Sequence, residues 1–160
     1  MPEEKASDFA KASSDKKWKV EKAAGGVVFK KHEGQTFVLM VNPKKPNYGP
    51  PQDYWTWPKG LYDHDGESKE QTALREVREE GGVEAEVLES LGYIKFFRSF
   101  DHVLKFVDFW LMEYISGDPK DHDEEIANAE FVTLDEAEAR LKFPHDKEIL
   151  TRAKEKLTQY

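Results

Sequence analysis

The sequence predicts an α/β fold of the α+β kind, in which helices cover the faces of a mixed β-sheet. Three observations predict it: two apolar strand-like segments come first, a capped and highly charged helix follows, and further strands and helices come after it. A chain of 160 residues with 38% hydrophobic content can build one domain around a real core. We expect residues 1–17, which are polar and lack periodicity, to be a flexible tail, and residues 18–160 to form the domain.

The first strands are predicted by β-prone apolar segments between turn signals. Residues 23–29 and 37–41 read as strands, and residues 31–34 supply the turn between them. Residues 42–51 are rich in proline and are expected to form a loop. Residues 54–57 then predict a short strand that leads the chain toward the central helix.

The second half of the chain repeats strands and then helices. Residues 86–98 and 103–114 predict two long strands, and residues 130–133 predict a short one. Thr133 and Glu136 form a capping-box pattern that begins a helix to about Leu141. A last helix begins at Pro144 and ends near Leu157. Its expected buried stripe consists of Ile149, Leu150, Ala153 and Leu157.

The central helix has clear signals at both of its ends. Ser68 and Gln71 form a capping box at its start, and Gly81 with Gly82 supplies a left-handed stop. An apolar arc on the same helix is expected to anchor it to the core. This arc consists of Ala73, Leu74 and Val77.

The same helix gathers three carboxylates on one face. Glu76, Glu79 and Glu80 are three and four residues apart, so their side chains project in similar directions. Like charges at such spacings repel by about 0.2–0.5 kcal/mol per pair. The pattern therefore favours a bound Mg2+, with Mn2+ as an alternative, because these ions prefer oxygen ligands. Such a cation can neutralise a pyrophosphate and activate water, as pyrophosphate hydrolysis requires.

The segment from Gly60 to Val83 resembles the signature of the Nudix hydrolases, which cleave nucleoside diphosphates linked to a further moiety. That signature is G-x5-E-x7-R-E-U-x-E-E-x-G-U, where U is aliphatic, and the chain matches every defined position from Glu67 to Val83. Gly60 and Glu67 are separated by six residues instead of five. One extra residue in an exposed turn costs little. The resemblance implies the family's α/β/α sandwich.

The resemblance also implies roles for individual residues. The three helical glutamates are implied to bind the metal, and Arg75 is implied to pair with Glu67 and so orient them. A guanidinium group suits this bidentate work. A backbone carbonyl at Lys59 or Gly60 is implied to be a further metal ligand.

Two parts of the chain, the central helix and a later acidic loop, offer candidates for the general base. Glu79 and Glu80 are the catalytic candidates on the helix, and Glu80 could serve as metal ligand and base together. Glu125, in an acidic loop, could supply an additional carboxylate, although charge runs in loops are usually just solvated. Glu125 is favoured over Glu124 because it directly precedes Ile126, which would dock the loop.

Basic side chains outside the signature could bind phosphate. Lys59 is the first candidate because it directly precedes Gly60. A second group lies around a strand turn and could neutralise a polyphosphate, although a solvated hairpin explains it equally well. This group consists of Lys95, Arg98, His102 and Lys105.

Aromatic side chains could bind the base of a nucleotide. Tyr48, Tyr54 and Phe143 are candidates for stacking against a purine. Aromatic residues near strands more often belong to the core, so only some of the three should touch a ligand.

Looser matches in the second half of the chain are similar to the diadenosine polyphosphate hydrolases of the family. They lie at residues 109–113, 123–126, 131–136 and 143–147. They imply a hydrolase of dinucleoside polyphosphates, such as diadenosine tetraphosphate or hexaphosphate, in which water attacks phosphorus. Sanitation of nucleoside triphosphates, pyrophosphate removal from RNA 5′ ends and a non-catalytic nucleotide-binding module stay open as alternatives.

Composition limits the partners of the protein. A net charge of −8 argues against a general nucleic-acid-binding surface. The absence of cysteine excludes disulfides and thiol chemistry. No apolar run approaches a membrane span, so we expect a cytoplasmic protein whose partner is a small-molecule nucleotide polyphosphate. The sequence does not predict an oligomeric state.

Overall fold

A mixed β-sheet lies between two helical layers in the computed structural model, which describes residues 17–44, 53–62 and 64–160. Five strands follow one another in the order β4-β5-β1-β2-β6, and β3 pairs with β1 beside this path. The pairing of β1 with β5 is parallel, and the other pairings are antiparallel. The strands are β1 (Lys19–His32), β2 (Gln35–Pro43), β3 (Lys59–Leu61), β4 (Val83–Arg98), β5 (Val103–Gly117) and β6 (Ile126–Thr133).

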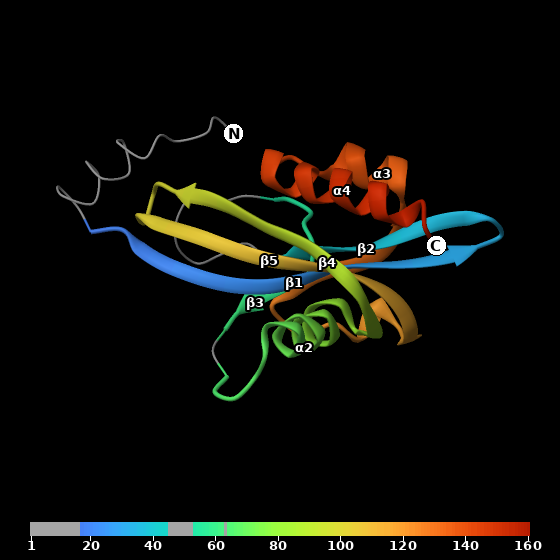
Figure 1. The fold of residues 1–160 in the computed structure, drawn as a ribbon, viewed down its shortest axis with the longest axis horizontal. Coiled ribbons are helices and arrows are strands. Elements are labelled where there is room, and N and C mark those ends of the chain that lie inside the picture. Colours follow the sequence, from blue (N-terminus) through green and yellow to red (C-terminus); the bar gives the residue numbers. More distant parts are fainter. Residues whose placement is uncertain (1–16, 45–52, 63) are drawn as a thin grey trace.

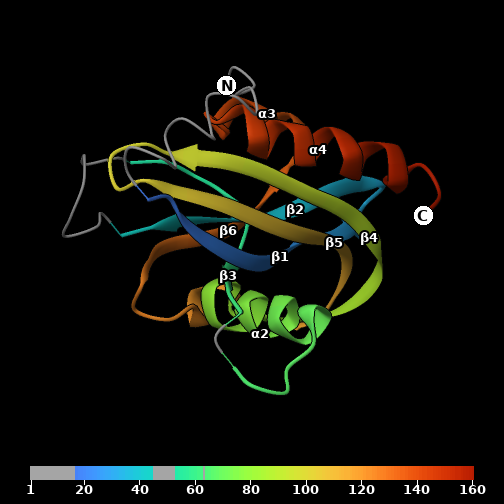
Figure 2. The same cartoon turned by 60° about the vertical axis from the view of Figure 1, so that its left-hand side comes forward.

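The helices divide between the two faces of the sheet. Helix α2 (Lys69–Gly81) lies on one face, whereas α3 (Leu134–Arg140) and α4 (Pro144–Leu157) lie on the other, as Figures 1 and 2 show. A short 3-10 helix, η1 (Pro119–Asp121), follows β5. The three layers confirm the predicted α/β/α sandwich. No helix in the described parts of the chain is both long and apolar enough to cross a membrane.

Helix α2 begins and ends at the predicted residues. The Ser68 hydroxyl accepts from the Gln71 N–H at 3.1 Å, and the Gln71 side chain accepts from the Ser68 N–H at 2.8 Å. Gly82 ends the helix with a φ of 73°, the left-handed conformation that glycine adopts without a steric penalty. Ala73 and Val77 are fully buried. The apolar arc thus holds α2 against the sheet, as predicted.

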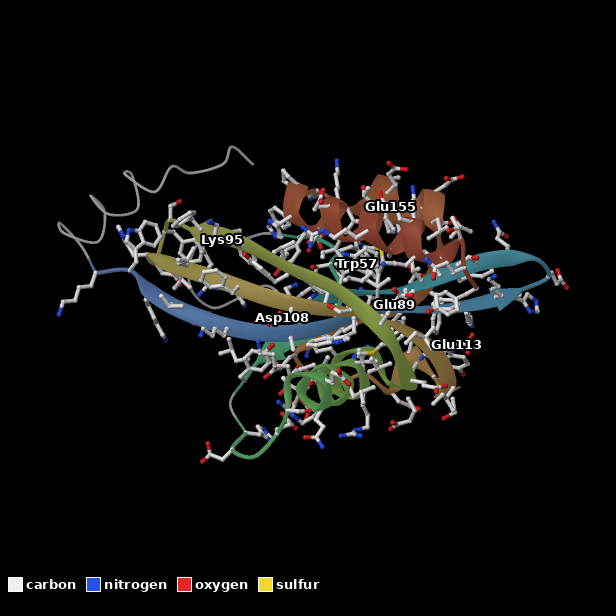
Figure 3. All side chains as sticks on the ribbon, viewed as in Figure 1. Trp57, Glu89, Lys95, Asp108, Glu113 and Glu155 are labelled. Atoms are coloured by element: carbon white, nitrogen blue, oxygen red, sulfur yellow. The ribbon has the colours of Figure 1, made fainter. Side chains whose placement is uncertain are left out.

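Two hydrophobic cores fill the space between the layers. The core beneath α3 and α4 includes Trp57, which lies between the sheet and α4 in Figure 3. The predicted stripe of α4, from Ile149 to Leu157, is buried in this core. The smaller core beneath α2 includes Leu39, Val77 and Met112. Both faces of the sheet are therefore covered over its central part.

The prediction of a strand at residues 54–57 is wrong. Only isolated bridges form there, between Thr56 and Val41 and between Trp55 and Leu141. The strand begins later, as β3, because Pro58 has no N–H to donate to a ladder and Trp57 turns its side chain into the core. The Pro58 carbonyl instead accepts from the Gly26 N–H at 3.2 Å.

Five strands, β1, β2, β4, β5 and β6, are longer than predicted. Strand β1 includes charged residues before residue 23, because its pairing with β5 begins already at Lys19 and Val103. Strand β6 begins at Ile126, since it pairs with β2 over its length. The expected loop at residues 42–51 begins late, because Asn42 and Pro43 still belong to β2. Residues 1–16 of the expected tail, and Tyr48, lie outside the described residues.

Candidate active site

Strand β3 brings the signature glycine against helix α2. A Cβ atom added to Gly60 would overlap the carboxylate of Glu76, so only glycine allows this close approach. Glu76 is only 8% exposed. Gly60 therefore lies against α2 although the turn before this helix contains one extra residue.

Lys59 connects β3 to the end of α2 through its backbone. Its N–H donates to Glu80 Oε1 at 3.0 Å. Burial raises the pKa of Glu80 to about 8, although the Lys59 N–H and the charge of Lys59 act in the opposite direction. The carboxylates of Glu76 and Asp123 raise this pKa further. Glu80 is thus a carboxylate held close to other negative charges.

Arg75 holds the acidic groups in place from the other side. Its Nε and Nη2 contact the Glu67 carboxylate at 3.0–3.2 Å. Its Nη1 donates to Glu76 Oε1 at 2.8 Å and to Glu79 Oε2 at 3.2 Å. The bonds from Arg75, followed by one from the Thr72 hydroxyl, hold the pKa of Glu67 below its ordinary value. Arg75 is only 9% exposed, and its hydrogen bonds to three glutamates fix the orientation of its guanidinium group.

The donor chemistry of this cluster fits a divalent cation. Glu76, Glu79 and Glu80 offer carboxylate oxygens, and Gly60 leaves space for backbone and carboxylate to meet. In the described residues, no three acidic or histidine side chains already converge as a finished metal site. The reason is visible: Arg75 holds Glu76 and Glu79, while Glu80 turns to the Lys59 N–H. The predicted metal ligands are thus together but tied to protein partners.

The acidic loop after η1 contacts the end of α2 through the backbone of Asp123. The Asp123 N–H donates to the Glu79 carbonyl at 2.7 Å. Ile126 is buried and anchors the loop as expected, but Glu124 and Glu125 are exposed. Asp123 is the loop carboxylate that influences Glu80. Sequence reasoning missed it, because the acidic run alone does not indicate which member faces the helix.

Two lysines lie on the side of the sheet that faces α4. Lys59 Nζ donates to Thr56 Oγ1 at 2.8 Å and to the Trp57 carbonyl at 3.4 Å. Lys105 pairs across strands with Phe96, a residue packed against the core beneath α4. Burial, followed by the charge of Lys59, lowers the pKa of Lys105 to about 8. The two ammonium groups therefore repel each other electrostatically.

The predicted basic group around the β4–β5 turn is divided. Arg98 is engaged by Asp101 at 2.9 Å and by Glu21 at 3.6 Å. Lys95 is next to Phe96 in β4, so it points to the opposite face of the sheet from Lys105, and it is exposed (Figure 3). The ring of His102 packs against Trp18 at 4.9 Å. Of the four residues, only Lys105 and Arg98 face the α4 side.

Aromatic rings gather at the start of α4. Phe143 contacts Tyr54 edge-on at 5.3 Å and lies parallel to His145 at 5.4 Å. His145 stacks on Phe96 at 4.0 Å, and its burial lowers its pKa to about 4. The structure thus brings two of the predicted aromatic residues together. It adds Phe96 and His145, which were not among the aromatic candidates predicted from the sequence.

Comparison with known proteins agrees with this geometry. Residues 19–153 match the family described as "NUDIX domain". The chain belongs to the Nudix family. A putative mutator protein MutT4 of Mycobacterium tuberculosis is 37% identical over 103 residues, which cover 63% of the chain and 41% of that protein. An 8-oxo-(d)GTP phosphatase of Mycolicibacterium smegmatis is 28% identical over 147 residues, covering 90% and 44%. The chain thus spans less than half the length of these two relatives.

Solved structures share the Nudix fold. An Ap4A hydrolase of C. elegans, solved as a binary complex, aligns with a TM-score of 0.71 and 26% identity, covering 88% of the chain and 99% of that structure. A NUDIX hydrolase of Nitrosomonas europaea aligns with the same TM-score and 20% identity, covering 86% and 90%. The second likeness supports the fold alone.

Replacement of Gly60 by alanine tests the close approach of β3 to α2. The new methyl group would displace the end of the flexible Glu76 side chain, so stability should change little. Metal affinity should fall by about 10–100-fold, the usual effect of disturbing groups around a metal. Calorimetric titration with Mn2+ and thermal unfolding would measure the two effects. Unchanged Mn2+ affinity would show that Glu76 is not held for a metal.

Replacement of Glu79 by glutamine tests the metal assignment of the Nudix helix. We expect Mg2+-dependent turnover to be abolished while folding is largely intact, because the Glu79 side chain is 44% exposed. Glu70→Gln is the matched control, since Glu70 is an exposed residue of the same helix. Turnover rates and circular dichroism spectra of both variants would be compared. Wild-type-like turnover of the Glu79 variant contradicts the assignment.

Proposed function

We propose that this protein is a Mg2+-dependent hydrolase that cleaves pyrophosphate linkages in nucleoside polyphosphates by water attack on phosphorus. The observation that carries the proposal is the meeting of β3 and α2. There Gly60 leaves room for the Glu76 carboxylate, and the Lys59 N–H donates to Glu80. Arg75 donates to both Glu67 and Glu79. Membership of the Nudix family supports the same chemistry.

The residues of α2 divide the work at the proposed metal site. Glu76, Glu79 and Glu80 would hold Mg2+, which when bound neutralises phosphate charge and makes water more acidic. Arg75 orients the glutamates with a fork of charge-assisted hydrogen bonds. A proton from water would pass to Glu80 or to Asp123, which approaches from the docked loop. Asp123 takes the place that the sequence suggested for Glu125.

Two lysines would bind the phosphate chain. The Lys59 N–H donates to Glu80, and the charges of both Lys59 and Glu80 affect the pKa of Lys105. A pair of neighbouring ammonium groups is unfavourable without an anion, and a phosphate chain would relieve that repulsion. Arg98 contributes less in this proposal because Asp101 and Glu21 already engage it.

The aromatic group at the start of α4 would bind the nucleoside. Phe96 and Phe143 stack on His145, and Tyr54 packs edge-on against Phe143. His145 is neutral at pH 7 because its pKa is about 4. A neutral ring stack suits a purine, which binds largely through its flat apolar faces. Lys95, on the opposite face, is left out of this proposed site.

Dinucleoside polyphosphates are the proposed substrates. The structural likeness to an Ap4A hydrolase over 99% of its length supports this choice, together with an additional cation beyond Lys59. Nucleoside triphosphate sanitation is the second candidate, because the two curated relatives are named as a mutator protein and an 8-oxo-(d)GTP phosphatase. The net charge of −8 weighs against RNA 5′ ends.

A substrate panel tests the proposed function. Diadenosine tetraphosphate and hexaphosphate, ADP-ribose, nucleotide sugars, and ordinary and 8-oxo nucleoside triphosphates would be incubated with the protein and Mg2+. We expect the dinucleotides to give the highest kcat/KM, and hydrolysis in 18O-water would identify the attacked phosphorus. A clear preference for 8-oxo-dGTP would favour sanitation. Hydrolysis of none of them would favour the non-catalytic binding module.

The lowered pKa of Lys105 predicts a pH dependence. Its ammonium faces Lys59, Glu21, Arg98 and Glu80 and loses its charge as pH rises through about 8. We therefore expect kcat/KM for a nucleoside polyphosphate to decline above pH 8, since kcat/KM reports groups of the free enzyme.

Two variants of Lys105 check this prediction. Lys105→Arg keeps its charge at all these pH values and should shift the decline to higher pH. Lys105→Met should lower kcat/KM about tenfold near pH 7, the scale of one charge-assisted hydrogen bond. If wild type and the arginine variant decline at the same pH, Lys105 does not bind the phosphate chain.

A further inference from the structure

A buried hydrogen-bonded relay leads from helix α4 to the Lys59 ammonium. Lys59 Nζ donates to Thr56 Oγ1 at 2.8 Å, and Thr56 Oγ1 donates to Asp146 Oδ2 at 2.9 Å. We propose that Asp146, acting through Thr56, is a positioning residue that holds the Lys59 ammonium in place for the phosphate chain. This inference rests on the proposed function of Lys59 as a phosphate contact.

The direction of the relay is fixed by the chemistry of the hydroxyl. Thr56 has a single hydroxyl hydrogen, and it is directed to the Asp146 carboxylate. Its oxygen is then left to accept, which suits the Lys59 ammonium. Thr56 is 2% exposed and Asp146 is 1% exposed, so water competes little for these bonds.

Asp146 is itself held firmly. Its carbonyl accepts from Trp57 Nε1 at 3.1 Å, which ties α4 to the segment before β3. Farther along α4, Arg152 Nη1 donates to the carbonyls of Leu91 and Tyr93 at 3.1 and 2.9 Å. The helix that carries Asp146 is thus attached both to the edge strand β4 and to the segment that carries Thr56.

The relay connects with the proposed metal site through one residue. The side chain of Lys59 ends the relay, while its N–H holds Glu80. A lysine side chain is otherwise flexible, and fixing it in advance removes that cost from substrate binding. Helix α4 can therefore influence the position of a cation beside a carboxylate of α2, on the opposite face of the sheet.

Packing alone does not explain a carboxylate at position 146. Its Oδ1 is buried and has no hydrogen-bond partner among the described residues. Leaving such an oxygen unsatisfied costs stability, which a neutral residue at this position would avoid. A negative charge behind Thr56 instead favours the positively charged Lys59, which lies near the cationic Lys105.

The matched pair Thr56→Val and Thr56→Ser tests the relay. Valine keeps the volume but cannot accept from Lys59, whereas serine keeps the hydroxyl. We expect Thr56→Val to lower kcat/KM for a nucleoside polyphosphate on the order of tenfold or more, chiefly through KM, and Thr56→Ser to stay within about threefold of wild type. Equal kcat/KM for valine and serine variants that both fold would overturn the proposal.

A double-mutant cycle separates positioning from a purely structural role. Asp146→Asn should lower the affinity for the non-hydrolysable α,β-methylene-ATP, measured with Mg2+ by calorimetry. In a Lys59→Met background the same change should have little effect, because its target is gone. Equal effects of Asp146→Asn in both backgrounds would overturn the proposal.

A measurement without substrate distinguishes failure of the relay from failure of the proposed function. The 15N-labelled Lys59 ammonium should give a protected NMR signal in the wild type and in Thr56→Ser, and lose it in Thr56→Val. If the signal behaves so but the protein hydrolyses no nucleotide, the proposed function fails and the positioning of Lys59 stands. If the signal does not depend on Thr56, the relay fails whatever the activity.

Discussion

The site depends on the close contact between the backbone of β3 and the carboxylate of Glu76. This contact exists because Gly60 has no side chain and because the apolar arc of α2 presses the helix onto the sheet. Once α2 is fixed at this distance, the Lys59 N–H reaches Glu80 and the acidic loop reaches the Glu79 carbonyl. The absence of a side chain at Gly60 therefore helps to set the positions of several charged groups.

The crowded carboxylates need compensation, and the protein supplies it with one guanidinium. Arg75 contacts Glu67, Glu76 and Glu79 at once, so its five donors serve three acids. Glu80 lies outside this fork, where its Oε1 accepts from the Lys59 N–H, and burial raises its pKa. The cluster keeps the oxygen chemistry that a hard cation prefers.

The sequence predicted the parts of this arrangement that depend on local spacing. The capping box at Ser68, the left-handed Gly82 and the buried arc of α2 all follow from rules within one helix. The strand before the signature was misplaced because the effect of Pro58 on the ladder outweighs the β propensity of the tryptophans. The contacts of Asp123, Phe96 and His145 could not be predicted, since they join elements far apart in the chain.

The extra residue before α2 shows why the two halves of the site differ. Gly66 has a φ of 78° and no atom within 4 Å of an added Cβ, so it lies in open space, and Gly60 lies against the Glu76 carboxylate. The metal side of the site thus tolerates variation in its entry turn. The α4 side tolerates less variation, because Thr56 and Trp57 each form a hydrogen bond with Asp146, about ninety residues away in the chain. Its details must therefore be encoded jointly by two distant segments, and no single motif can contain them.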